Sequence, residues 1–436
     1  MKTSLEEISP VKKKLSIEIE STEVDKKLNE AYRELGKKAK IPGFRPGKVP
    51  RKILETHFSA QVTEDVTKNL ISETFPMAIQ EVETFPLGAP LLEKDILKQG
   101  QNFKYSAVME VRPKFEVNDY LELEEEKERL SVSEEDVRKQ LEQIRETNGK
   151  LTTIDQGRPI QKDDYVVIDY EGFEEGSPLE GIKSPNFLLK VGSNEFHPGF
   201  DEALTGLHKE DETEIRVDFE KDHYHLKLAG KSVDFKVKIT DIKEMVLSEL
   251  NDEFAQNLGA DIKDLEDLKN KVKESITAQE EKRIDRDLKQ RILKKISDSV
   301  DFDLPQILIE SEIDYAVENV AQNLIRSGSS LEKAGLSEEK LREEFTPSAQ
   351  KRVKGLLILG EIAKQDNIEV DEEDLANSFR DLAANTGQDM ETIRKYYEAK
   401  NMVGSLKEKL LEEKTLNYLV ENAKISKVDE LSDKIT

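Results

Sequence analysis

The clearest candidates for binding chemistry are one phenylalanine and seven basic residues between positions 37 and 52, with no acid among them. The chain as a whole carries a net charge of −25. Phe44 stands beside Arg45 near the middle of residues 41–50, where three prolines and two glycines exclude a continued helix or a central strand. A basic loop with an aromatic side chain at its tip suits an anionic surface such as structured RNA with its proteins. The alternative is a pair of helices joined by a solvated basic turn.

Other patterns that carry chemistry are weak. His223 and His225 would share one face of a strand, but no third ligand is evident, so we expect no metal site. The absence of cysteine excludes disulfides, a thiol nucleophile and thiolate metal ligands. No phosphate-binding Gly-x-x-x-x-Gly-Lys-Ser/Thr loop supports the use of ATP, and no Ser/His/Asp order indicates hydrolysis. We expect no cofactor.

Length and charge set further bounds. A chain of 436 residues is long enough for two to four domains, each with its own core. With 92 acids against 67 bases, free nucleic acid is not expected as the main partner, and any contact with RNA must be local. The first residues contain no apolar run that resembles a signal peptide, and no later stretch approaches ~20 apolar residues. We therefore expect a cytoplasmic protein without membrane contact.

The basic loop is expected to be positioned by a small α+β module. Residues 11–20 and 101–111 alternate between apolar and polar types, which predicts two strands with one wet side. A helix capped by Ser21 or Thr22 and closed by Gly36 precedes the loop, and the last proline of the loop suits the first turn of a second helix. The order strand, helix, loop, helix, strand places the loop at an exposed end.

The rest of the chain divides by composition. An acidic connector contains a helix that starts at Ser133, and its acid-rich run 122–128 is most simply a solvated face. Residues 155–244 contain many short strands around one helix at 200–207, which is typical of a small antiparallel half-barrel. From residue 245 the apolar spacing is helical, and two of the helices are expected at 336–345 and 349–366. Such helices can form arms with an apolar lining, although periodicity alone favours an ordinary bundle core.

The octapeptide Gly-Phe-Arg-Pro-Gly-Lys-Val-Pro, residues 43–50, resembles the ribosome-docking signature of the bacterial trigger factor family. Phe44, Arg45, Gly47 and Lys48 match the Gly-Phe-Arg-x-Gly-Lys core of that signature, and Pro46 replaces a further basic residue found in some members. The resemblance implies docking on the large ribosomal subunit near the exit tunnel, against ribosomal protein and rRNA.

The half-barrel resembles the FKBP-type peptidyl-prolyl isomerases. The matching pieces are Val167–Tyr170, Leu179–Gly181, Phe187–Gly192, Phe196–Phe200 and Val233–Phe235. In that family, the corresponding positions line the pocket or carry an acid, and here they are Tyr170, Glu180, Phe187, Phe196, His197, Phe200, Tyr224 and Phe235.

Such a pocket needs no nucleophile. An X–Pro bond isomerises slowly because amide resonance must be lost, against a barrier of ~18–20 kcal/mol. An apolar, aromatic-walled site favours the twisted amide, which has lost its charge separation. Two features depart from the family: His197 replaces a bulky aliphatic residue, and the turn Phe219–His225 is substituted, so that Tyr224 takes the position of a histidine.

Together these observations predict a multidomain α+β protein. Its parts are a ribosome-binding α+β domain at 1–111, a connector and helix at 112–154 that pack with the C-terminal domain, an FKBP-like antiparallel half-barrel with one helix at 155–244, and an all-α chaperone domain with helical arms at 245–436. The resemblance implies an ATP-independent chaperone that binds nascent and unfolded polypeptides and isomerises X–Pro bonds. A homodimer off the ribosome is compatible with the family, although no residue pattern here indicates one.

Two alternatives belong to other classes. One is a free-standing soluble prolyl isomerase whose helices only recruit substrate, and deletion of 155–244 would then abolish its cellular function instead of leaving part of it. The other is a structural adaptor with an inactive isomerase domain, for which the substituted turn at 219–225 is the one indication.

Overall fold

The structure is a computed structural model that describes residues 1–42, 44, 48–154, 157–193, 198–220, 228, 230–259, 261–332 and 334–429. The chain divides into two compact units, each built from separate stretches of sequence. The first comprises Met1–Leu121, Leu293–Asn319 and Arg342–Asn422, and the second comprises Glu122–Ile292, Val320–Leu341 and Ala423–Thr436.

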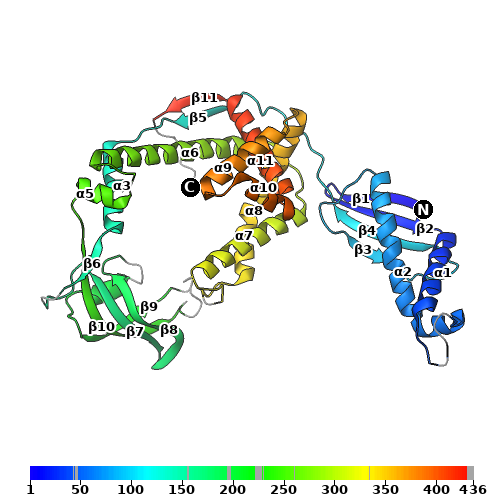
Figure 1. The fold of residues 1–436 in the computed structure, drawn as a ribbon, viewed down its shortest axis with the longest axis horizontal. Helices are drawn as coiled ribbons and strands as arrows, with labels where there is room; N and C mark the ends of the chain where they lie inside the picture. The colour runs from blue at the N-terminus through cyan, green and yellow to red at the C-terminus, as the bar shows by residue number, and fades with distance from the viewer. Residues whose placement is uncertain are drawn as a thin grey trace. The chain divides into compact units, whose positions relative to one another are not determined.

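The N-terminal part of the first unit is an antiparallel sheet in the order β1-β2-β4-β3, with two helices on one face (Figure 1). Its elements are β1 (Lys2–Ser9), β2 (Lys12–Ile19), α1 (Ser21–Lys38), α2 (Arg51–Glu81), β3 (Leu91–Lys94) and β4 (Phe103–Glu110). The predicted order strand, helix, loop, helix, strand is confirmed.

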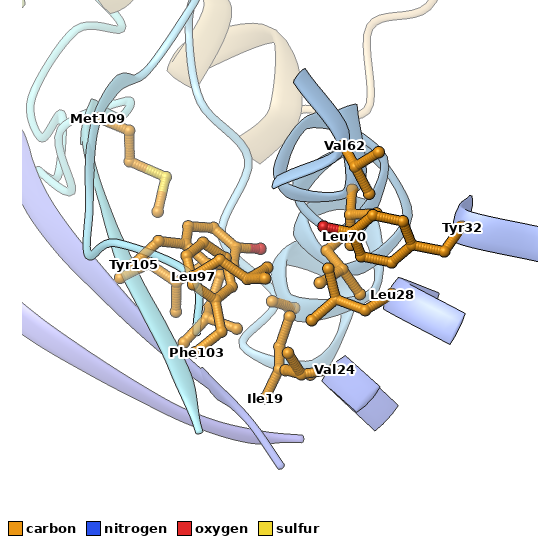
Figure 2. Close-up of a cluster of buried hydrophobic side chains, with 14 of the residues drawn as sticks. Ile19, Val24, Leu28, Tyr32, Val62, Leu70, Leu97, Phe103, Tyr105 and Met109 are labelled. Carbon is orange, nitrogen blue, oxygen red and sulfur yellow. The ribbon is translucent and has the colours of Figure 1, made fainter. Parts of the chain in front are cut away.

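The core of this module forms where the alternating strand residues meet the helices (Figure 2). Phe103 and Tyr105 of β4 stack with ring centroids 5.8 Å apart, and the Tyr105 hydroxyl lies 2.7 Å from the hydroxyl of Thr74 on α2. Val24 and Leu28 of α1 pack against the same layer and are buried. Burial of one face of each element therefore fixes the two helices on the sheet and holds the loop between them.

Details of α1 differ from the prediction. The residue before the helix is Glu20, with no side-chain cap, so neither Ser21 nor Thr22 caps it. Gly36 lies inside the helix, which continues to Lys38. The helix extends two residues beyond Gly36 and is followed by Ala39, which is buried in the module core; this burial outweighs the low helix propensity of one glycine.

The connector contains a helix and a strand. Helix α3 (Glu134–Thr147) starts as predicted, with a capping box in which Ser133 and Asp136 bond to each other's backbone amides. The expectation that 122–128 is a solvated face was wrong, because β5 (Glu124–Glu128) pairs in parallel with β11 (Lys424–Val428) near the C-terminus.

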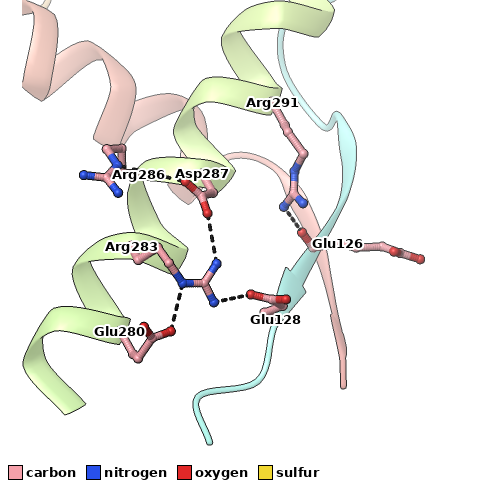
Figure 3. A network of polar contacts seen from close by, with 7 residues as sticks. All are labelled: Glu126, Glu128, Glu280, Arg283, Arg286, Asp287 and Arg291. Carbon is pink, nitrogen blue, oxygen red and sulfur yellow. Dashed lines mark hydrogen bonds and ion pairs between the residues drawn. The ribbon is translucent and has the colours of Figure 1, made fainter. Parts of the chain in front are cut away.

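Side chains of α6 (Leu265–Ser299) bind the acids of β5 (Figure 3). Arg283 lies between Glu128 at 2.5 Å, Glu280 at 2.8 Å and Asp287 at 3.1 Å. Arg291 donates to the Glu126 carbonyl and lies 3.6 Å from the Glu125 carboxylate. Two carboxylates of the acid run, those of Glu125 and Glu128, are therefore paired with arginines of a helix far away in sequence.

The second unit also contains the predicted half-barrel. Its sheet has the order β6-β10-β7-β8, with β9 paired to β10. The elements are β6 (Lys150–Thr153), β7 (Tyr165–Glu174), β8 (Ser177–Lys190), α4 (Pro198–Leu204), β9 (Glu212–Asp218) and β10 (Ser232–Val246). The pairs between these strands are antiparallel, as predicted.

The remaining chain is helical up to β11. Its helices are α5 (Asp252–Leu258), α6, α7 (Gln306–Arg326), α8 (Glu338–Gln365), α9 (Glu372–Thr386), α10 (Met390–Ala399) and α11 (Val403–Glu421). In the described part of the chain, no helix has the length and apolar character needed to cross a bilayer.

Helix α8 replaces the two helices predicted at 336–345 and 349–366. Pro347 lies inside it, although an interior proline costs ~3 kcal/mol. Leu341, Ala349 and Val353 form one buried stripe on both sides of the proline. The burial of this stripe compensates for the hydrogen bond that proline cannot make.

Candidate isomerase pocket and docking segment

Four of the predicted pocket residues come together as one aromatic cluster in the half-barrel. The Tyr170 ring meets the edge of Phe187 at 5.5 Å between centroids and lies 6.0 Å from Phe235. Phe200 of α4 lies 5.6 Å from Phe235 in a T-shaped arrangement. Phe200 and Phe235 are fully buried, whereas Tyr170 and Phe187 are half-buried. Phe200 and Phe235 therefore form the floor of the cluster, and Tyr170 and Phe187 form its more exposed rim.

Strand alternation explains this placement. Tyr170 on β7 and Phe235 on β10 face the inner side of the sheet, together with buried neighbours such as Ile168 and Ile239. Gly172 makes room for the floor, because a Cβ there would lie 2.6 Å from Ile182 and 3.3 Å from the Phe235 ring. The sequence thus combines large rings with one glycine where the rings need space.

Phe219 belongs to the same cluster and was not among the predicted site residues. It is buried at the end of β9, and its ring centroid lies 6.3 Å from that of Phe235. The sequence pattern could have indicated that Phe219 is buried, because it continues the alternation of β9, in which Ile215 and Val217 are also buried.

Other predicted site residues lie outside the described part of the chain. These are Phe196, His197 and Tyr224, and of Glu180 only the backbone is described. His223 and His225 are outside it as well. Among the residues that are described, no group of three or more His, Cys, Asp or Glu side chains could hold a metal ion.

A partly buried ion pair holds the start of β7. Arg158 donates to both oxygens of Asp164, at 2.6 and 2.8 Å, and the Gln161 amide donates to the same carboxylate at 2.8 Å. The backbone of Asp164 pairs with Val191 at the end of β8. Asp201 of α4 accepts from the amide of Gly192 at 2.9 Å. These bonds fix β7, β8 and α4 relative to one another, and with them the aromatic cluster.

The charge of Asp164 makes this anchor sensitive to acid. Burial raises the pKa of Asp164, but the hydrogen bonds from Arg158 and the Gln161 amide outweigh it and hold the pKa below its usual range. Because the pKa is lower in the folded state, the carboxylate stabilises the domain above the unfolded pKa of about 4 and loses this effect at lower pH. We expect the stability of the half-barrel to fall as the pH drops below about 4, and Asp164→Asn to flatten that fall. Hydrogen exchange of β7 amides across this pH range measures it.

The matched control is Asp163→Asn, since Asp163 is exposed and lies 3.8 Å from Lys190. An equally steep acid decline in Asp164→Asn and in the wild type would contradict the assignment.

The docking segment connects α1 to α2. Phe44 is 39% exposed although it is a large apolar residue, and Lys48 is exposed too. Arg45 and Gly47 lie outside the described residues. The prediction that no local structure buries Phe44 is confirmed.

Several cations of the segment are not neutralised. Lys37 pairs with Glu34 at 2.5 Å, and Arg51 pairs with Glu55 at 2.6 Å and lies over the Tyr32 ring. In contrast, Lys38 and Lys52 have no acid within 4 Å among the residues described. Such cations can replace counterions on a nucleic-acid backbone.

Comparisons with known proteins match most of the chain in three parts. Residues 1–144 match the family model of the bacterial trigger factor protein, and residues 264–421 match the model of its C-terminus. Residues 156–240 match the FKBP-type peptidyl-prolyl cis-trans isomerase model.

Full-length relatives agree with these models. A trigger factor of Geotalea uraniireducens is 36% identical over 430 residues, which cover 98% of this chain and 99% of the relative. One of Syntrophotalea carbinolica is also 36% identical, over 98% of this chain and 97% of the relative. One of Halothermothrix orenii is 35% identical, over 97% of this chain and 99% of the relative.

A solved structure reported as "Promiscuous Substrate Recognition in Folding and Assembly Activities of the Trigger Factor Chaperone" has the same fold, with a TM-score of 0.50. It is 21% identical, and the match covers 97% of this chain and 99% of that one. The chain belongs to the bacterial trigger factor family, and it is a ribosome-associated chaperone with an FKBP-type peptidyl-prolyl cis–trans isomerase domain.

Proposed function

We propose that the segment 37–52 docks the protein on the large ribosomal subunit near the exit tunnel. Phe44 inserts into an apolar site of the ribosome, while Arg45 and Lys48 bind rRNA phosphates or acidic protein groups. Gly47 lets the backbone approach closely. The observation that carries the proposal is the exposure of Phe44 in a segment where Lys38 and Lys52 have no acid within 4 Å among the described residues, on a chain of net charge −25.

We further propose that X–Pro bonds isomerise at the aromatic cluster. Tyr170, Phe187, Phe200 and Phe235 support this role, because their rings are already packed together from three strands and a helix. By resemblance, Glu180, Phe196, His197 and Tyr224 complete the site. An apolar floor lowers the cost of twisting the amide because it disfavours the charge-separated planar form.

The helical region 245–436, with the connector 112–154, is proposed to hold nascent and unfolded chains without ATP in the cytoplasm. Apolar side chains left exposed on its helices support this assignment, among them Tyr315, Ile325 and Tyr396, which are 64%, 66% and 55% exposed. Weak contacts at several such places suit clients of unrelated sequence. Residues 1–111 and 155–244 would act as the docking and isomerase domains, and a homodimer off the ribosome is part of the proposal.

The docking proposal is tested by co-sedimentation with salt-washed ribosomes. Alanine at Phe44, Arg45 and Lys48 should weaken binding about tenfold to a hundredfold, because it removes one apolar anchor and two cations. The slope of log affinity against log salt should become shallower by about 0.7–0.9 for each phosphate that the variant no longer neutralises.

A matched control is alanine at Phe85, Lys94 and Lys98, which removes one exposed phenylalanine and two lysines from the same module. Retained binding by this control and loss by the first variant supports the segment. Equal loss in both variants would mean that net charge alone drives association, and no binding by the wild type at low salt would overturn the docking proposal.

A further inference from the structure

Strand β8 contains a bulge beside the aromatic cluster. Ile168 of β7 pairs with Phe187, and Tyr170 pairs with Ser184, so that Asp169 alone stands opposite both Pro185 and Asn186. Two residues on one strand opposite one on its partner define a β-bulge, which redirects the strand that carries it.

The bulge changes which side chains of β8 face the inner side of the sheet. Ile182 and Leu189 are both buried. Their residue numbers differ by an odd number, and in an uninterrupted strand two such residues face opposite sides of the sheet. Lys183 and Leu188, one on each side of the bulge, are both exposed. If the ladder continued regularly from the Tyr170–Ser184 pair, Phe187 would stand opposite Val167, on the outer face of the sheet, and could not meet Tyr170.

A backbone conformation and a hydrogen bond maintain the bulge. The backbone of Asn186 has a φ of +52°, in the left-handed region that asparagine tolerates better than most residues. Its amide donates to the Asp169 carboxylate at 2.7 Å, a short and charge-assisted bond. Asp169 precedes Tyr170, so its side chain lies on the opposite face of the sheet from the aromatic ring.

We propose that Asp169 is a positioning residue for prolyl isomerisation. From the outer face of the sheet, its carboxylate holds the amide of Asn186 in the bulge, and the bulge turns Phe187 inward against Tyr170. The proposal rests on the pocket assigned above to Tyr170, Phe187, Phe200 and Phe235.

The test compares variants of the full-length protein in two measurements, isomerisation of a short X–Pro peptide and NMR cross-peaks between the Tyr170 and Phe187 rings. Asp169→Ala should lower kcat/KM about tenfold, since a misplaced wall of the site weakens transition-state binding. The same variant should no longer show the cross-peaks between the rings. Asp169→Asn keeps an acceptor oxygen and should restore both.

The matched control is Glu171→Ala, an acid of the same strand and face that pairs with Lys183 at 3.2 Å outside the bulge. It should match the wild type in both measurements. Asn186→Gly should also do so, because glycine adopts a positive φ freely, whereas Asn186→Val should resemble Asp169→Ala.

Wild-type cross-peaks and activity in Asp169→Ala, or an Asp169→Asn variant as impaired as the alanine one, would overturn the positioning role. Failure of the pocket assignment would give a different combination of results in the two measurements. Variants of Asp169 would then change the cross-peaks between the rings while leaving peptide isomerisation at the wild-type rate.

Discussion

Replacing Phe235 with alanine is expected to lower the free energy of unfolding of the isomerase domain by about 3–5 kcal/mol. Phe235 is fully buried and packs against the rings of Tyr170, Phe200 and Phe219. The variant loses the transfer free energy of a whole ring and leaves a cavity that the hydrogen-bonded strands around it cannot collapse to fill. Hydrogen exchange of β7 and β10 amides in the full-length chain reports the change for this domain alone.

The matched control is Phe173→Ala. Phe173 lies on the neighbouring strand, is only half-buried and has Lys236 over its ring at 5.0 Å. We expect it to cost about 1 kcal/mol, in proportion to the smaller area removed from water. Similar losses in the two variants would show that Phe235 is not the centre of this core.

Replacing Arg291 with alanine is expected to release the β5–β11 pair from α6. The Arg291 and Glu125 side chains are 13% and 14% exposed, so removing the arginine removes a cation 3.6 Å from a carboxylate that is largely held out of water. Breaking a buried ion pair from one side costs about 3–5 kcal/mol. Two strands of five residues have little stability of their own, so we expect them to open.

The measurement is hydrogen exchange of residues 122–129 and 423–429, which should approach the rate of unstructured chain. Arg286→Ala is the matched control: Arg286 lies on the same helix, is 68% exposed and is 4.0 Å from Asp287. It should change the opening free energy by less than about 0.5 kcal/mol. Protection of β5 in Arg291→Ala equal to that in the wild type would contradict the argument.

The elements that the sequence predicted well are those with one buried face. Residues 11–20 and 101–111 alternate because β2 and β4 lie between helices and solvent, and their pattern reports that burial directly. Strand β1 was missed because most of its residues are exposed at the edge of the sheet, which leaves no alternation to detect. Strand β5 contains no apolar residue at all, and its structure depends on partners distant in sequence.

The candidate site also contains residues that the sequence could identify and one that it could not. Resemblance identified Tyr170, Phe187, Phe200 and Phe235, and the structure brings these four together because each lies on a regular element with a defined inner face. The role proposed for Asp169 could not be predicted. It depends on the register between β7 and β8, and one additional residue in β8 changes which side chain faces the pocket.

The pairing of β5 with β11 has a consequence for synthesis of the chain. Arg129 and Asp429, which form an ion pair at the end of the two strands, are 300 residues apart in sequence. During translation β5 leaves the ribosome long before β11 exists, because the two paired strands lie far apart in the sequence. Closing so long a loop is slow. The β5–β11 pair therefore cannot form while the intervening residues are being made, so a chaperone for growing chains must itself leave β5 unpaired during that part of its own synthesis.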